Sequence, residues 1–112
     1  TELNLERPSA ARIYDYLLGG FYNFDVDRAA AQRITEVLPE MPLFMRANRA
    51  FLRRVVRFLT DQGIDQFLDL GSGIPTVGNV HEIAQQANPS ASVVYVDNEP
   101  VAVTHSRTIL QG

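Results

Sequence analysis

The residues best suited to chemistry lie between positions 67 and 98. The run Phe67-Leu-Asp69-Leu-Gly71-Ser-Gly73 places a carboxylate just ahead of two closely spaced glycines. Glycines at such a turn tolerate tight backbone geometry and let a ligand approach the main chain. A second carboxylate, Asp97, ends the next apolar run, near the roughly 20-residue offset at which an acidic residue meets a ribose hydroxyl. Because a carboxylate can accept two hydrogen bonds from a ribose diol, these residues indicate a site for a nucleoside ligand.

The glycine pattern departs from that of dinucleotide-binding proteins. Their fingerprint, G-x-G-x-x-G, needs a third glycine where this chain has Thr76, and Pro75 stands beside it. The next helix is expected to start only near Asn79, so no helix N-terminus is ready for a pyrophosphate. Asp69 would repel a diphosphate, but it could orient the loop or bind an ammonium group. S-adenosylmethionine, which has an amino-acid end and a nucleoside end, therefore fits better than NAD(P).

Two alternative functions stay open at this point. One is an NAD(P)-dependent oxidoreductase, which Thr76 and Asp69 disfavour. The other is a nucleoside-binding module without catalysis. Each motif residue also has a plain structural explanation: Asp69 could brace the loop, the glycines could serve the turn alone, and Asp97 could cap a helix.

The elements that must position these residues fall into two halves. The first half has apolar residues at helical spacing, and Ser9 and Gly19-Gly20 can begin and end its first helix. The second half has the order strand, helix, strand, helix, which favours a parallel sheet with right-handed crossovers. Both strands are apolar on both faces, so we expect helices to cover each face. The expected elements are helices starting near residues 10, 25 and 42, strands at 66–70 and 92–96, and helices near 79–87 and 100–110.

The fold class is therefore α/β, with a helical region at residues 1–63 and a β-α-β-α core at residues 64–112. Two strands are fewer than the roughly five or six of a typical sheet, and an isolated two-stranded unit is marginally stable. We expect the sheet to be incomplete in this chain. The missing strands would come from a longer chain or from another chain.

Composition and charge exclude several classes of function. Thirteen acidic residues outnumber ten arginines, and the net charge of −3 disfavours binding to nucleic acid. The absence of cysteine excludes disulfides and cysteine nucleophiles, and His81 and His105 lack partners at metal-ligand spacing, so no metal is expected. No apolar run approaches the roughly 20 residues that cross a bilayer, and the first residues do not form a signal peptide. We expect a soluble, cytoplasmic protein with no membrane or nucleic-acid partner.

Two side-chain clusters in the first half have ordinary explanations. Arg46, Arg49, Arg53 and Arg57 recur along the third expected helix, opposite its apolar face, and we interpret them as a solvated surface. One of these arginines could instead grip a cofactor carboxylate with two hydrogen bonds. The aromatic residues between positions 14 and 24 are expected to pack mostly in the core.

At these motifs the chain resembles a known family. Asp69-Leu-Gly71-Ser-Gly73 and Val96-Asp97-Asn98 are similar to the first two cofactor motifs of class I (Rossmann-like) S-adenosylmethionine-dependent methyltransferases. More closely, nearly the whole chain resembles a bacterial family of S-adenosyl methyltransferases of largely unassigned substrate. The stretches that carry this closer resemblance are Pro8-Ser-Ala-Ala-Arg-Ile-Tyr-Asp-Tyr-Leu-Leu-Gly-Gly20, Asn23-Phe24, Asp27-Arg28, Arg46-Ala-Asn-Arg-Ala-Phe-Leu52, Gly71-Ser-Gly-Ile-Pro-Thr76, Asn79-Val-His-Glu82 and Tyr95-Val-Asp-Asn98.

The resemblance implies a role for each matching residue. Asp69, Gly71 and Gly73 would line the methionine end of S-adenosylmethionine, and Ser72 and Ile74 would contribute loop backbone. Asp97 would bind the ribose hydroxyls, and Asn98 would lie by the adenine or ribose. Residues 1–63 would cover the site as a lid over a Rossmann-like core, with Arg12, Tyr16 and Asn23 as polar cofactor contacts. The methyl acceptor, the catalytic residues and the oligomeric state stay unassigned.

Overall fold

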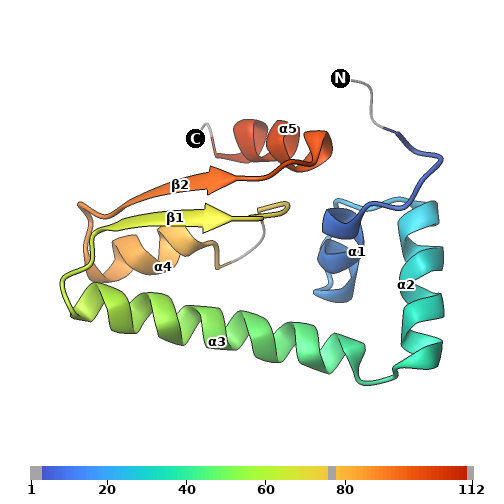
Figure 1. Ribbon diagram of the computed structural model, residues 1–112, viewed down its shortest axis with the longest axis horizontal. Helices are drawn as coiled ribbons and strands as arrows, with labels where there is room; N and C mark the ends of the chain where they lie inside the picture. The colour runs from blue at the N-terminus through green and yellow to red at the C-terminus, as the bar shows by residue number, and fades with distance from the viewer. Residues whose placement is uncertain (1–3, 76–77, 111–112) are drawn as a thin grey trace.

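The computed structural model describes residues 4–75 and 78–110, and it contains every helix and strand expected from the sequence. The elements, in chain order, are α1 (Ala10–Leu17), α2 (Asp25–Val37), α3 (Met41–Asp61), β1 (Gln66–Leu70), α4 (Val80–Ala87), β2 (Ser92–Val96) and α5 (Pro100–Ile109) (Figure 1). None of the described helices is long and apolar enough to cross a bilayer.

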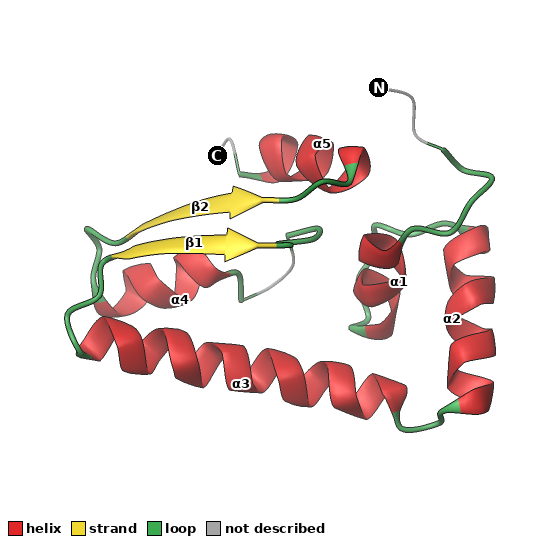
Figure 2. Cartoon of the chain, in the orientation of Figure 1, coloured by secondary structure: helices red, strands yellow, loops and turns green. Residues whose placement is uncertain are grey.

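The two strands form a parallel sheet, as expected. Gln66 pairs with Ser92 and Leu70 pairs with Val96, so the carboxyl ends of both strands reach the same edge. Figure 2 shows both strands pointing toward the end of the molecule where α1 and α2 stand. The loops that follow the two strands therefore face the N-terminal helices.

The hydrophobic core lies on one face of the sheet. Phe67, Val93 and Tyr95 on that face pack against a buried cluster from α3, α4 and the turn before β2. The buried members are Val56, Val80, Ile83, Ala84 and Ala91.

The other face of the sheet is open. Leu68, Leu70, Val94 and Val96 point away from the core and are exposed, Leu70 by 71%. The expectation that helices cover both faces is therefore wrong for the described residues. Apolar side chains on both faces do mark a sheet suited to burial on both sides, but the described elements cover only one.

The N-terminal helices are joined by buried charges. The side-chain oxygen of Ser9 accepts a bond from the Arg12 N–H and caps α1, as expected. The Arg12 guanidinium forms an ion pair with Asp27 of α2, with Nε 2.8 Å from Oδ2, and the two side chains are 2% and 0% exposed. Asp27 also accepts bonds from the backbone N–H groups of Ser9 and Phe24, each 2.9 Å long. This buried carboxylate thus holds together the start of α1 and the start of α2.

The aromatic segment between α1 and α2 differs from the expectation. Phe21 is 92% exposed, and Tyr22 and Phe24 are also exposed. These side chains lie at the surface instead of in the core because the core sits between the sheet, α3 and α4. Tyr22 contacts α5, with its ring 5.1 Å from that of His105.

Candidate functional site

The loop after β1 is built around two glycines in a backbone conformation that other residues rarely adopt. Gly71 and Gly73 have φ angles of 71° and 68°. A Cβ added at either position would meet no heavy atom of the described residues within 4 Å, chain neighbours aside. The conformation requires glycine, and the space over both residues is open. This loop can therefore be approached closely by a ligand.

The loop is tied to the end of β2. The N–H groups of Gly71 and Ser72 both donate to the carbonyl oxygen of Val96, at 2.8 and 3.1 Å. The Gly73 N–H donates to Oδ2 of Asp97 at 2.7 Å. The Ser72 N–H is thus already used, which leaves its carbonyl and hydroxyl groups for other contacts.

Asp97 braces the loop from the neighbouring strand. Its Oδ1 accepts a bond of 2.9 Å from the Glu99 N–H, while Oδ2 holds Gly73. A carboxylate has about four lone-pair positions, so two acceptor positions remain. Asn98, the next residue, is exposed beside it. The structural role and a ligand-binding role of Asp97 are therefore compatible.

Asp69 lies on the core-facing side of β1, directly opposite Tyr95 in the sheet register. Burial raises the pKa of Asp69 above its ordinary value; the nearby Arg49 charge opposes this rise, and Asp97 adds to it. The carboxylate is thus partly desolvated and lies within electrostatic range of both Arg49 and Asp97. A cationic group next to Asp69 would relieve this unfavourable environment.

The start of α4 is fixed by a residue of β2. The Tyr95 hydroxyl accepts a bond of 2.9 Å from the His81 backbone N–H and lies 2.6 Å from His81 Nδ1. Asn79 and Glu82 form the expected pair at the helix start, with Asn79 Nδ2 donating to Glu82 Oε1 at 2.7 Å. Burial raises the pKa of Tyr95, a rise that the backbone bond from His81 offsets in part. His81 thus has a structural partner that sequence spacing alone did not identify.

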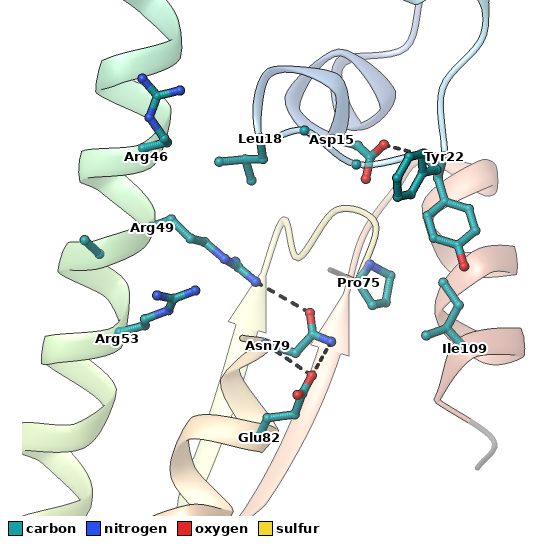
Figure 3. Close-up of a pocket in the computed structure, with 14 residues that line it drawn as sticks. Asp15, Leu18, Tyr22, Arg46, Arg49, Arg53, Pro75, Asn79, Glu82 and Ile109 are labelled. Atoms are coloured by element: carbon teal, nitrogen blue, oxygen red, sulfur yellow. Dashed lines mark hydrogen bonds between the residues drawn. The ribbon is translucent and has the colours of Figure 1, made fainter. Parts of the chain in front are cut away.

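A cavity of about 660 Å³ lies between the N-terminal helices and the C-terminal half of the chain, which contains the sheet, α4 and α5. Figure 3 shows α3 on one side of it, the turn after α1 on another, and the loop after β1 between them. Its lining residues are Asp15, Leu18, Gly19, Gly20, Phe21, Tyr22, Arg46, Arg49, Ala50, Arg53, Pro75, Asn79, Glu82 and Ile109. The segment expected to act as a lid therefore shares a cavity with the end of the glycine loop at Pro75. Gly71, Gly73 and Asp97, at the strand ends, are not in its lining.

Arg46, Arg53 and Arg57 of α3 are exposed, which agrees with the solvated-surface interpretation, whereas Arg49 is half-buried. Arg46, Arg49 and Arg53 line the cavity, whereas Arg57, one helical turn further, does not. Arg49 reaches across to α4, where its Nη2 donates to the carbonyl oxygen of Gly78 at 3.2 Å. Helical spacing predicted the shared face correctly, but only the packing of α1 opposite α3 turns that face into a cavity wall.

The three lid residues singled out from the sequence do not line this cavity. Arg12 is engaged with Asp27, and its Nη2 donates to the carbonyl oxygens of Asn4 and Arg7. Tyr16 lines a separate groove with residues of α2 and Pro42. Asn23 is buried, and its Nδ2 donates to Asp15 Oδ2 and to the Gly20 carbonyl oxygen. Their observed contacts are with other residues of the N-terminal helical region.

Asp15 is a cavity-lining residue of α1 that sequence reasoning missed. It is 1% exposed, lines the cavity, and accepts bonds at Oδ2 from the Tyr22 N–H and Asn23 Nδ2, at 2.8 and 2.9 Å. Arg12 and Asp15 are three residues apart in a short helix followed by two glycines, a pattern that could have indicated buried charge. No group of three or more histidine, aspartate and glutamate side chains able to hold a metal occurs in the described part of the chain.

The fold and the site define a Rossmann-like α/β protein in which a glycine loop and an acidic strand end face the N-terminal helices (Figure 2). The chain belongs to the S-adenosyl methyltransferase family, whose model matches residues 1–112. A candidate methyltransferase from Thermobifida fusca YX is 51% identical and superposes with a TM-score of 0.91. A DUF574 family protein from Streptomyces avermitilis MA-4680 is 45% identical, with a TM-score of 0.89. Each match covers 96% of this chain, which spans 41% of either neighbour. No match is found among the curated proteins.

Proposed function

We propose that this chain forms the S-adenosylmethionine-binding part of a methyltransferase. The observation that carries the proposal is the open glycine turn beside Asp97. Two glycines with left-handed backbone leave free space at the carboxyl end of β1, and a carboxylate with two unused acceptor positions stands at the carboxyl end of β2. In open α/β sheets, ligands bind at this edge.

The donors and acceptors at this edge of the sheet fit S-adenosylmethionine. Asp97 would accept bonds from the ribose hydroxyls at its two remaining positions, and the exposed Asn98 would lie by the adenine or ribose. Asp69 would receive the cationic amino group, which its raised pKa makes favourable. Gly71, Ser72 and Gly73 would lie against the methionine end.

Arg49 is the residue of this chain that we assign to the cofactor carboxylate. It faces Asp69 closely enough to influence its pKa, and its guanidinium reaches the start of α4 at Gly78. A guanidinium can grip a carboxylate with two parallel hydrogen bonds. Asp69 and Arg49 would then hold the two charged groups of one amino-acid end.

The chain's contribution to catalysis would be positioning. S-adenosylmethionine, when bound, supplies an electrophilic methyl group on its sulfonium. The glycine loop would hold the methionine end, Asp97 would hold the ribose, and the turn after α1 would close the cavity against water. Holding two reactants in line lowers the barrier by removing the entropy cost of their encounter.

Calorimetric titration of the full-length protein tests the proposal. The wild type should bind S-adenosylmethionine and S-adenosylhomocysteine and should not bind NAD. Hydrogen bonds to a charged group contribute roughly 1.5–3 kcal/mol, so Asp97→Ala should weaken both ligands by about tenfold to a hundredfold. Asp97→Asn should weaken them less because its amide oxygen still accepts a bond.

Asp65→Ala is the matched control. Asp65 is an exposed acid immediately before β1, at the opposite end of the same strand. Its removal should leave both affinities unchanged. Wild-type affinity in a folded Asp97→Ala variant would contradict the ribose assignment, and tight binding of NAD without S-adenosylmethionine would contradict the proposed function.

A further inference from the structure

The cavity wall formed by α3 carries an unusual charge for this chain. Arg46, Arg49 and Arg53 come from one face of the helix and line the same cavity, in a protein whose net charge is −3 (Figure 3). The lining contains two carboxylates, Asp15 and Glu82. The positive groups therefore outnumber the negative ones at this wall, which is the reverse of the whole chain.

The two carboxylates are engaged by neighbours on their own side of the cavity. Asp15 Oδ2 accepts hydrogen bonds from the Tyr22 N–H and from Asn23 Nδ2. Glu82 Oε1 accepts a hydrogen bond from Asn79 Nδ2. Within residues 4–75 and 78–110, neither Arg46 nor Arg53 lies within 4.0 Å of a carboxylate, unlike Arg12, which pairs with Asp27, and Arg28, which pairs with Asp25. Arg53 packs its guanidinium against Gly78, where an added Cβ would lie 2.9 Å from Nη2. Among the described residues, no carboxylate pairs directly with Arg46 or Arg53, so both bring positive charge to the cavity.

A single carboxylate on the cofactor needs one bidentate guanidinium, and Arg49 is placed for that role. Arg46 and Arg53 stand three residues before and four residues after it on the same face. The rest of the wall is largely apolar, with Leu18, Ala50 and Pro75 among its members. Such a lining suits a small molecule with an apolar body and an anionic group. A volume of about 660 Å³ lies within the usual range for small-molecule sites.

We propose that the methyl acceptor is a small anionic molecule whose carboxylate or phosphate is held by the guanidinium groups of Arg46 and Arg53. This inference rests on the proposed function, because it assigns the second substrate of the same site. Guanidinium groups pair with both carboxylate and phosphate oxygens, so the two chemistries are separated by experiment. An extended nucleic acid is disfavoured by the net negative charge.

The test uses full-length protein saturated with S-adenosylhomocysteine, which occupies the cofactor position. Benzoate and inorganic phosphate serve as probes, and benzamide serves as the uncharged counterpart of benzoate. The wild type should bind at least one anion and should bind benzamide more weakly than benzoate. The double variant Arg46→Gln/Arg53→Gln should lose at least about tenfold in anion affinity, because each removed charge-assisted contact is worth roughly that factor.

Arg57→Gln is the matched control because Arg57 lies on the same helix outside the cavity lining. It should bind both probes like the wild type. The variant Arg46→Lys/Arg53→Lys keeps the charge and loses the planar fork, so it should show an intermediate affinity. This second variant also decides the test if the glutamine variant does not fold.

The outcomes separate this inference from the proposed function. If the wild type binds neither anion, or if all variants bind the anions equally, the inference is overturned. If the double variant loses affinity for S-adenosylhomocysteine but not for the anions, the two arginines serve the cofactor, which overturns the inference and leaves the proposed function standing. If the wild type does not bind S-adenosylhomocysteine, the proposed function fails, and with it the assignment of an acceptor.

Discussion

Two glycine turns lie on either side of the site, and they use glycine for different reasons. In the loop after β1, Gly71 and Gly73 have left-handed backbone and face open space. In the turn after α1, Gly20 faces the Asp15 carboxylate so closely that an added Cβ would collide with it. The first turn leaves room for a ligand, whereas the second leaves room for a side chain of the protein itself.

The two turns are also held by different kinds of contact. Backbone bonds from Gly71 and Ser72 to Val96 fix the loop after β1. The turn after α1 depends on buried charged side chains, chiefly Asp15 and the Arg12–Asp27 pair. A site between such turns has a loop fixed by backbone bonds on one side and, on the other, a turn that depends on a few buried side chains. Changes to the buried charges of α1 and α2 should therefore lower the free energy of unfolding more than changes to the loop after β1.

The largest loss in the free energy of unfolding is expected from Asp27→Ala. This substitution removes the partner of a buried arginine and leaves two backbone N–H groups without their acceptor. Breaking a buried ion pair in this way typically costs about 3–5 kcal/mol. Urea unfolding of the full-length protein measures the loss. Asp25→Ala, which removes an exposed ion pair with Arg28, is the control and should be nearly silent. Equal effects of the two variants would show that the packing of α1 against α2 does not depend on the buried charge of Asp27.

A smaller loss in the free energy of unfolding is expected from Gly20→Ala. The added methyl group would overlap the Asp15 carboxylate, and overpacking of this kind costs about 1–3 kcal/mol. The cost should fall when Gly20→Ala is made in an Asp15→Ala background, because the carboxylate it would meet is gone. A double-mutant cycle from urea unfolding measures this coupling. Strict additivity of the two substitutions would contradict the proposed packing.

Comparing Gly73→Ala with Gly63→Ala should separate the cost of backbone strain from the loss of ligand affinity. An L-residue in left-handed backbone costs about 1–2 kcal/mol, and Gly63, at the end of α3, has the same type of φ and the same open surroundings. Gly63→Ala should therefore lower stability by a similar amount. Only Gly73→Ala should also weaken S-adenosylhomocysteine, as measured by calorimetry. If both variants keep the wild-type affinity, the loop glycines serve the turn alone.

The sequence predicted the elements well because their signals are local. The Ser9 cap, the capping pair of Asn79 and Glu82, and two short apolar runs define helices and strands within a few residues. The glycine loop and Asp97 were also predicted, because parallel strands bring consecutive carboxyl ends to one edge.

The contacts that the N-terminal helices make at the site could not be predicted as well from the sequence. Which face of α1 points to the cavity depends on long-range packing between α1, α2 and α3. Helical spacing could not show that Arg12 meets Asp27, or that Asp15 instead of Asn23 lines the cavity. The His81–Tyr95 contact likewise joins two elements through their tertiary arrangement. The arginines of α3 had the right spacing but no local signal for what lies opposite them.

The smallest expected effect is a change with pH in the free energy of unfolding, caused by the titration of Asp69. Burial raises the pKa of Asp69 above its ordinary value of 3.8. The folded protein then binds this proton more tightly than the unfolded chain, so the free energy of unfolding should fall as pH rises from below 3.8 through the raised pKa. Asp69→Asn does not titrate and should lack this fall, so its stability relative to the wild type should increase over that window.

Urea unfolding between about pH 3 and pH 7 compares the two proteins. Asp65→Asn, at the exposed end of β1, should follow the wild type across this range. Saturating S-adenosylhomocysteine should reduce the difference between wild type and Asp69→Asn, because an ammonium group beside Asp69 favours the charged carboxylate. If the ligand leaves the difference unchanged, the ammonium group lies elsewhere, and the open loop would hold the methionine end without help from Asp69.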